Sequence, residues 1–178
     1  MYWRGVRRVF DGADRKASAE AAERSIGVTV PMWTKDCRVY WLVSLEDFTR
    51  EYLSRSDRAG WFEVIRAGQP CKLYMDIDGP PGLDDVERFE AALFSTVTRL
   101  LADDYQYRPI RLEPYVLDAT TTTKFRRHYI WPVVWVNNKA AGAFVDKVKA
   151  TLTHPYRVHI DGAVYTNDRN FRVWDSAK

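Results

Sequence analysis

The sequence predicts an α+β protein in which mixed or antiparallel sheets are flanked by helices. Helical periodicity, clearest over residues 86–101, interrupts pairs of short apolar runs instead of alternating strictly with single strands. The chain has 178 residues, of which 46% are hydrophobic, so it can bury one full core. We therefore expect a single domain over residues 1–178, with an N-terminal arm and helix over residues 1–32 and a core over residues 33–178.

The first half of the chain predicts helices over residues 17–25 and 45–52. It predicts strands over residues 38–43, 61–65 and 72–77. Residues 26–36, which include Pro31, are expected to form a loop or an irregular connection. Ser44 and Asp47 resemble a capping box at the start of the second helix. The last two strands are expected to pair as a hairpin through residues 68–70.

The second half predicts a long helix over residues 86–101 and a further helix over residues 140–152. It predicts strands over residues 114–118 and 125–136, and a final segment with short strands over residues 158–174. The Pro-Pro-Gly run at residues 80–82 breaks the chain before the long helix. The polar run at residues 120–123 is expected to be a loop between the two strands. Pro132 should mark an edge position or a bulge in the second of them.

Composition limits the function classes only loosely. Lys and Arg total 27 against 24 Asp and Glu, and a net charge of +3 does not by itself indicate nucleic-acid binding. The basic, aromatic run at residues 1–10 could hold phosphates and stack bases, or pack on its own domain. Two cysteines, Cys37 and Cys71, are too few for a disulfide framework or a four-thiolate zinc site. Because no apolar run approaches the ~20 residues that span a bilayer, we expect an intracellular protein without a membrane partner.

Three aspartates follow apolar stretches and are candidate metal ligands. On a strand, Asp76 and Asp78 point to one face, which they share with Tyr74. Two such carboxylates repel each other unless a cation lies between them, and Mg²⁺ or Mn²⁺ prefers oxygen ligands. A solvated strand end is the alternative for this pair. Asp161, after Ile160, adds a third acid, and three carboxylates can hold two metal ions roughly 3.5–4 Å apart for nucleotidyl transfer.

Basic residues that could bind a triphosphate occur in two groups. Lys124, Arg126 and His128 alternate along a predicted strand and would share a face. Arg169 and Arg172, with Asn170 between them, form the second group. Phosphoryl transfer needs such donors for the phosphate oxygens that do not react. Acids and bases together therefore predict a metal-dependent nucleotidyltransferase.

These residues resemble the catalytic core of the archaeo-eukaryotic primase superfamily, and most closely its eukaryotic-type primase-polymerase branch. The family's first motif, a DxD on a strand, is matched by Asp76 and Asp78. Its second, SxH after Lys-Phe, is matched at Lys124 and His128, whereas Arg126 stands at the serine position. Its third, an apolar residue and Asp, is matched at residues 160–161 and continues as GAVYTNDRNFRVWDSAK. The likeness runs from about Trp33 to Lys178, with Arg38 opening a further matched strand.

The resemblance implies a sheet-rich catalytic core with an RRM-like module, which would prime and extend DNA-templated chains from NTPs or dNTPs with two Mg²⁺ or Mn²⁺ ions. It implies a role in repriming or damage tolerance during replication, in a nucleus or mitochondrion or, for a viral protein, in the host cell. We expect a monomer that binds a DNA template and primer, with a single-strand-binding protein as a candidate partner. The metal ligands it implies are Asp76, Asp78 and Asp161. The implied nucleotide contacts are Arg38, Lys124, His128, Asn170, Arg172 and Lys178.

Two other functions remain open from the sequence. A non-catalytic nucleic-acid-binding module could keep the fold and its basic residues. A metal-dependent nuclease could use the same carboxylates. A nuclease has little use for a triphosphate pocket, and a non-catalytic module has little need of three acids. The sequence therefore favours the primase and polymerase over both alternatives.

Overall fold

The structure is a computed structural model that describes residues 7–8, 30–34, 40–43, 45–56, 61–80, 85–153 and 156–172. The chain divides into two compact units, one of residues 1–65 with 168–178 and one of residues 66–167. The expected helix over residues 17–25 lies outside the described residues. No helix in the described ranges is both long and apolar enough to cross a membrane. The single-domain expectation stays a prediction.

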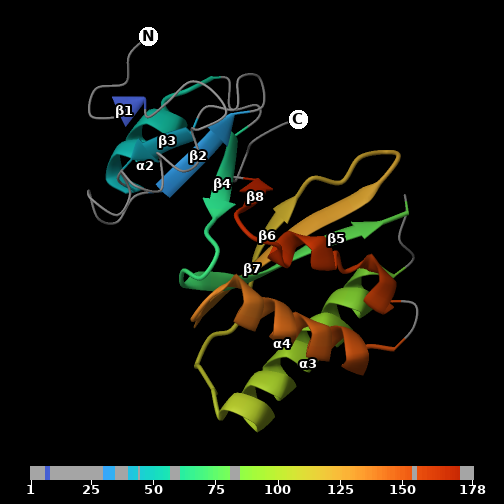
Figure 1. The fold of residues 1–178 in the computed structure, drawn as a ribbon. Helices are drawn as coiled ribbons and strands as arrows, with labels where there is room; N and C mark the ends of the chain where they lie inside the picture. The colour runs from blue at the N-terminus through green and yellow to red at the C-terminus, as the bar shows by residue number, and fades with distance from the viewer. Residues whose placement is uncertain are drawn as a thin grey trace. The chain divides into compact units, whose positions relative to one another are not determined.

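In its described residues, the first unit contains a five-stranded sheet and the helix α2 (Figure 1). The sheet has the order β1-β3-β2-β4-β8, and every paired strand is antiparallel to its neighbour. These elements are β1 (Arg7–Arg8), β2 (Val30–Thr34), β3 (Tyr40–Val43), α2 (Leu45–Leu53), β4 (Trp61–Ile65) and β8 (Arg169–Arg172). Helix α2 is where the sequence predicts it, although Ser44 of the expected capping box lies outside the described residues.

The expectation of a loop before β3 is wrong. Residues 26–36 were expected to lack regular structure, but Val30–Thr34 form β2. Pro31 lies opposite Leu42 of β3, and the pairing of β2 with β4 begins only at Met32. The missing N–H of the proline therefore affects one neighbouring strand at most.

The hairpin predicted through residues 68–70 is also wrong, because its two strands belong to different sheets. β4 pairs with β2 and β8, whereas the next strand, β5 (Cys71–Gly79), pairs with β7 (Phe125–Trp135). The turn itself is present, with Gly68 at φ +74°. Its backbone N–H donates to Oδ1 of Asn138 at 3.3 Å, so a distant side chain holds the turn.

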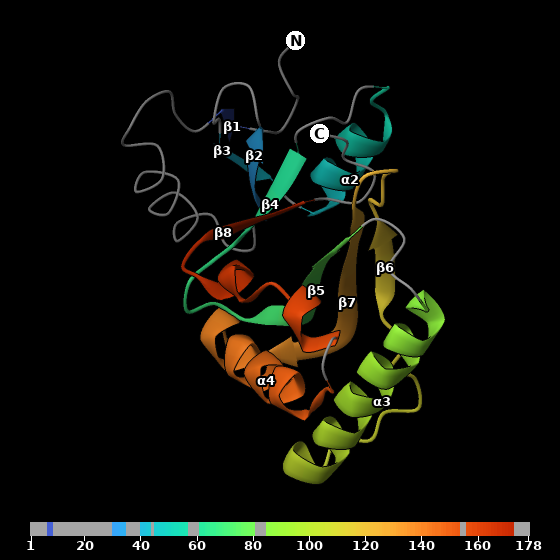
Figure 2. The same ribbon diagram turned by 90° about the vertical axis from the view of Figure 1, so that its right-hand side faces the viewer.

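The second unit is a three-stranded antiparallel sheet with two long helices (Figure 2). The strand order is β5-β7-β6, with the central strand β7 paired on both sides. After the helices the chain returns to β5, where Ile160 forms an antiparallel bridge with Ile77. The remaining elements are α3 (Val86–Tyr105), β6 (Tyr115–Asp118), α4 (Asn138–Thr151) and the 3₁₀ helices η1 (Tyr156–His159) and η2 (Gly162–Tyr165).

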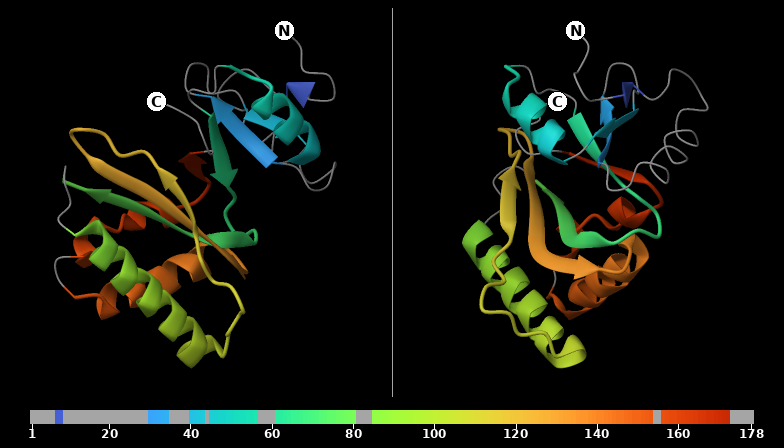
Figure 3. Two further views of the ribbon diagram at one scale, coloured as in Figure 1. Left: turned by 180° about the vertical axis from the view of Figure 1, so that it is seen from behind. Right: turned by 90° about the vertical axis from the view of Figure 1, so that its left-hand side faces the viewer.

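Helices α3 and α4 share one hydrophobic core with the sheet, and both lie on the same side of it in Figure 3. Along β5, Leu73, Met75 and Ile77 enter this core, whereas Asp76 and Asp78 on the alternate positions are partly exposed. Each fully buried apolar side chain contributes roughly 1.5–3 kcal/mol. The core residues from β5 and α3 are Leu73, Met75, Ile77, Phe89, Leu93, Val97, Leu100 and Leu101.

Pro132 lies at a bulge in the central strand, so the bulge alternative is confirmed and the edge alternative is wrong. The register of β5 and β7 shifts between Lys72, opposite Val134, and Leu73, opposite Trp131. On the other side of β7, the pairing with β6 ends at Ile130. Neither neighbour therefore needs a hydrogen bond from the proline nitrogen.

The α+β class with antiparallel sheets and flanking helices is confirmed. The final segment was expected to contain short strands, and it contains β8 together with the 3₁₀ helices η1 and η2. The RRM-like module stays a prediction.

Candidate active site

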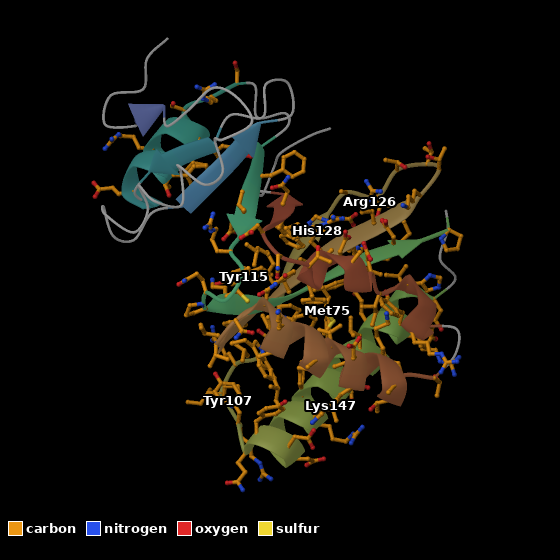
Figure 4. All side chains as sticks on the ribbon, in the orientation of Figure 1. Met75, Tyr107, Tyr115, Arg126, His128 and Lys147 are labelled. Atoms are coloured by element: carbon orange, nitrogen blue, oxygen red, sulfur yellow. The ribbon has the colours of Figure 1, made fainter. Side chains whose placement is uncertain are left out.

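The face of the β5 and β7 pair opposite the shared hydrophobic core carries the candidate site. Asp76 lies directly opposite His128, and Asp78 directly opposite Arg126. Lys124 precedes β7 and continues the same alternation. We call these five residues the charged face; Figure 4 labels Arg126 and His128 on it. The prediction that the alternating acids and bases each share a face is borne out, and the structure places the two sets against each other.

Asp78 is held by two cations. Nζ of Lys124 donates to its Oδ2 and Nε of Arg126 to its Oδ1, both at 2.8 Å. The Arg126 side chain is 20% exposed and that of Asp78 32% exposed, so the pair is only partly screened by solvent. Burial raises the pKa of Asp78, but the hydrogen bonds and charges of Arg126 and Lys124 outweigh it and lower the pKa below its usual value. The carboxylate is therefore ionised at neutral pH.

Asp76 lies next to an imidazole. Nε2 of His128 is 3.3 Å from its Oδ1, and the His128 side chain is 9% exposed. The Oδ1 atom is buried, yet no donor among the described residues forms a well-aligned hydrogen bond to it. A buried carboxylate oxygen without such a bond has an unmet demand for a cation or a donor.

Asp161 is brought beside Asp76 by the backbone. Its N–H donates to the carbonyl oxygen of Asp76 at 2.9 Å, next to the Ile77–Ile160 bridge. Its own Oδ1 accepts from the N–H of Ala163 at 2.8 Å and caps helix η2. The return of the chain along β5 thus joins two acids that lie 85 positions apart in the sequence.

Two tyrosines fix this return, and the sequence reasoning did not assign them a role. The Tyr74 hydroxyl donates to the carbonyl of Val164 at 2.9 Å, and the Tyr165 hydroxyl donates to the carbonyl of Tyr74. The two rings lie 4.9 Å apart. Burial raises the pKa of Tyr165 well above its ordinary value, so its hydroxyl stays protonated as a donor. Gly142 of α4 gives Tyr165 room, since a Cβ there would come within 2.9 Å of the Tyr165 Cβ.

The acids match a divalent cation only in part. Asp76 suits one, because no described residue donates a well-aligned hydrogen bond to its buried Oδ1 and Asp161 is its backbone neighbour. Asp78 in this arrangement suits one less well, because the charges of Lys124 and Arg126 bonded to its oxygens would repel a divalent ion. Within the described ranges, no group of three or more His, Cys, Asp or Glu side chains is arranged to hold a metal ion. The expected pair of Mg²⁺ or Mn²⁺ ions stays a prediction.

The second predicted basic group lies on another element. Arg169 and Asn170 belong to β8 in the first unit, opposite Ile65 and Val64 of β4. Arg172 ends the same strand, and only its backbone is described. Arg38 and Lys178 lie outside the described residues. Nucleotide contacts by these five residues stay predictions.

Comparison with known proteins gives matches of a single kind, although no family model matches the chain. The chain is 30% identical to the mouse DNA-directed primase/polymerase protein over 124 residues, which are 66% of this chain and 23% of that protein. It is 28% identical to the human protein over 147 residues, which are 75% of this chain and 26% of that protein. It is 29% identical to the bovine protein over 124 residues, which are 66% of this chain and 22% of that protein. The chain thus spans about a quarter of the length of these curated relatives.

The structure combines an antiparallel α+β fold with acids facing bases on one sheet face, and all three matches are to proteins named as a DNA-directed primase/polymerase. The relationship is of the primase-polymerase type: this chain is a relative of the DNA-directed primase/polymerase proteins. The resemblance predicted from the motifs is confirmed.

Proposed function

We propose that this chain forms the catalytic core of a metal-dependent nucleotidyltransferase that primes and extends nucleic acid on a DNA template. The observation that carries the proposal is the charged face, where β5 supplies acids and β7 supplies bases in register. Relatives named DNA-directed primase/polymerase support the same activity class. The substrates are NTPs or dNTPs with a template and primer, and the proposed role is repriming or damage tolerance during replication.

Asp76 and Asp78 of the charged face, together with Asp161, would hold the divalent metal. Asp76 and Asp161 offer oxygens on neighbouring backbone positions, and Asp78 offers a third carboxylate two residues from Asp76. When bound, Mg²⁺ or Mn²⁺ supplies activation of the attacking hydroxyl and charge stabilisation on the phosphates. Tyr74 and Tyr165 act as positioning residues, because their hydrogen bonds hold the segment that follows Asp161 against β5.

The bases of the charged face would bind the triphosphate. Lys124 and Arg126 donate to an anionic oxygen of Asp78 in the structure, and a phosphate oxygen is an acceptor of the same type. His128 is 7% exposed and lies opposite Asp76, with its Nε2 3.3 Å from Oδ1 of that acid, so it is proposed to act next to the metal ligands. Further proposed nucleotide contacts are Arg38, Arg169, Asn170, Arg172 and Lys178. A monomer, an intracellular location and a single-strand-binding partner remain part of the proposal.

The test is single-nucleotide extension of a primed template by the 178-residue chain with Mg²⁺ or Mn²⁺. Asp76→Asn should lower the incorporation rate by about 10³-fold or more, because metal stabilisation of the transition state is worth several kcal/mol. Asp104→Asn is the matched control, since Asp104 of α3 pairs with Lys147 of α4 and neither residue belongs to the charged face. Thermal unfolding of both variants shows whether the fold is intact. Incorporation by Asp76→Asn at the wild-type rate would overturn the assignment, as would a wild-type chain that incorporates nothing with either metal.

A further inference from the structure

Both oxygens of Asp78 already have cationic partners, which bears on how a divalent ion could reach it. Lys124 and Arg126 each bond one oxygen at 2.8 Å. Each oxygen keeps a second lone pair, but a metal ion bound there would lie close to the charges of Lys124 and Arg126 and would be repelled by them. Binding of metal to this carboxylate therefore competes with two charges that belong to the protein itself.

Arg126 is the better fixed of the two competitors. It lies directly opposite Asp78 in the β5 and β7 register, and its side chain is 20% exposed against 44% for Lys124. Its backbone is tied to the preceding turn: its N–H donates to Oγ1 of Thr120 at 3.2 Å, and its carbonyl accepts from the N–H of Ala119 at 2.9 Å. A guanidinium also stays charged at any working pH. The ion pair of Arg126 with Asp78 is therefore held in place by the pairing of β5 with β7 and by the turn before β7.

We infer that Arg126 is a built-in counterion of Asp78 that makes divalent-metal binding depend on a bound triphosphate. This inference rests on the proposed function. A triphosphate is a polyanion and attracts Arg126 and Lys124, which lowers the cost of taking them from Asp78. The carboxylate that is released then becomes available to the metal. By linkage, metal must raise the affinity for triphosphate by the same factor.

The inference also assigns Arg126 a role distinct from that of a plain phosphate contact. A residue that only bound phosphate would leave the metal affinity of the triphosphate-free protein unchanged when removed. A counterion of Asp78 holds that affinity down, so its removal must raise it. The two roles therefore predict different results for one measurement, made without any nucleotide.

The experiment measures Mn²⁺ binding to the 178-residue chain by the electron paramagnetic resonance signal of free Mn²⁺, first without triphosphate. Arg126→Gln keeps a similar length and loses the charge, and it should bind Mn²⁺ about tenfold more tightly than the wild type, within the usual range of coupling between sites. Arg126→Lys restores the charge and should return the affinity toward the wild-type value. Arg99→Gln is the matched control, because Arg99 forms an exposed pair with Asp103 on α3. The Mn²⁺ affinity of this variant should equal that of the wild type.

A second arm adds a non-hydrolysable nucleoside triphosphate, with the Mn²⁺ bound by the triphosphate alone measured in protein-free solution and subtracted. Wild-type Mn²⁺ affinity should then rise at least about tenfold, and the rise should be smaller in Arg126→Gln. In the double variant Asp78→Asn with Arg126→Gln, the gain from losing Arg126 should disappear. Equal triphosphate-free affinity in Arg126→Gln and wild type overturns the inference, and so does a wild-type affinity that triphosphate does not change. If the wild-type chain incorporates no nucleotide, the proposed function is overturned. The Mn²⁺ measurements without nucleotide still decide whether Arg126 is the counterion of Asp78.

Discussion

Arg126 and Arg127 are neighbours in the sequence and lie on opposite faces of the same sheet. On the helix-covered face, Arg127 donates to Oε1 of Glu90 on α3 at 2.7 Å and to Oδ2 of Asp118 on β6 at 2.9 Å. On the charged face, Arg126 donates to Asp78, within the group that also holds Asp76. One arginine thus joins a helix to the sheet, and the other belongs to the candidate site.

The two networks differ in how completely they are satisfied. Oε1 of Glu90 accepts from both Arg127 and the Tyr129 hydroxyl, each at 2.7 Å. Burial lowers the pKa of Arg127, but its hydrogen bonds to Asp118 and Glu90 outweigh this and raise the pKa above its ordinary value. On the charged face, by contrast, no residue in the described part of the chain donates a well-aligned hydrogen bond to the buried Oδ1 of Asp76. The network on the helix side joins α3 to the sheet, and the proposed function assigns the charged face to metal and triphosphate.

The largest effect on stability should come from Glu90→Ala. It removes one acceptor from Arg127 and leaves the Tyr129 hydroxyl, on a strand residue that is fully buried, without its partner. The free energy of unfolding should fall by about 2–3 kcal/mol, measured by urea denaturation. Metal and triphosphate binding by the folded fraction should be unchanged. A variant as stable as the wild type would show that this network does not hold α3 to the sheet.

A smaller loss is expected from Gly142→Ala, which tests the packing behind Asp161. The new Cβ would meet the Cβ of Tyr165 at 2.9 Å and its Cγ at 3.0 Å, both too rigid to yield without a shift. We expect about 1–2 kcal/mol of destabilisation in the same assay. Because Tyr165 anchors the segment after Asp161, nucleotide incorporation should also fall. A drop in stability with full activity would mean that this segment does not position the acid.

The two faces should respond alike to acid. The pKa of Asp78 is lowered although burial raises it, through Arg126 and Lys124. The pKa of Asp118 is lowered in the same way through Thr120 and Arg127. A carboxylate with a depressed folded pKa adds stability above its unfolded pKa of about 3.9, and this stability is lost as the pH falls through the folded value. Unfolding measured between about pH 5 and pH 2 should depend less steeply on pH in Asp78→Asn and in Asp118→Asn than in the wild type. A slope that neither substitution changes would contradict both pairings.

The smallest effect is expected from Arg99→Ala, which touches neither face. Arg99 and Asp103 form a pair on α3 at 3.7 Å, with side chains 53% and 55% exposed. Such pairs contribute less than about 0.5 kcal/mol. The melting temperature should therefore move by no more than about 2 °C. A larger shift would weaken the contrast between the satisfied network of Arg127 and ordinary surface charge.

The sequence was sufficient wherever the decisive signal was local. The two-residue period of a strand placed Asp76 with Asp78, and Lys124 with Arg126 and His128, on common faces. The long helix α3 followed from its apolar spacing. These inferences need only the geometry of one element.

The misses concern partners that lie far apart in the chain. The turn at Gly68 has hairpin composition, yet Asn138 holds it and the two flanking strands join different sheets. The contact between Gly142 and Tyr165 and the bond from Asp161 to Asp76 likewise depend on how distant segments pack. No local pattern specifies such pairings, because they are selected by the free energy of the whole core.

The most direct test of the contrast between the faces is a paired measurement on Arg126→Gln and Arg127→Gln. Triphosphate affinity, by calorimetry with Mg²⁺, and the free energy of unfolding are determined for both variants and the wild type. Arg126→Gln should lose about tenfold or more in triphosphate affinity, since charge-assisted bonds contribute roughly 1.5–3 kcal/mol, and should lose less stability than Arg127→Gln, because Lys124 still pairs with Asp78. Arg127→Gln should lose about 2 kcal/mol of stability and keep its triphosphate affinity. The opposite pattern, or equal losses in both variants, would contradict the assignment of the charged face as the nucleotide site.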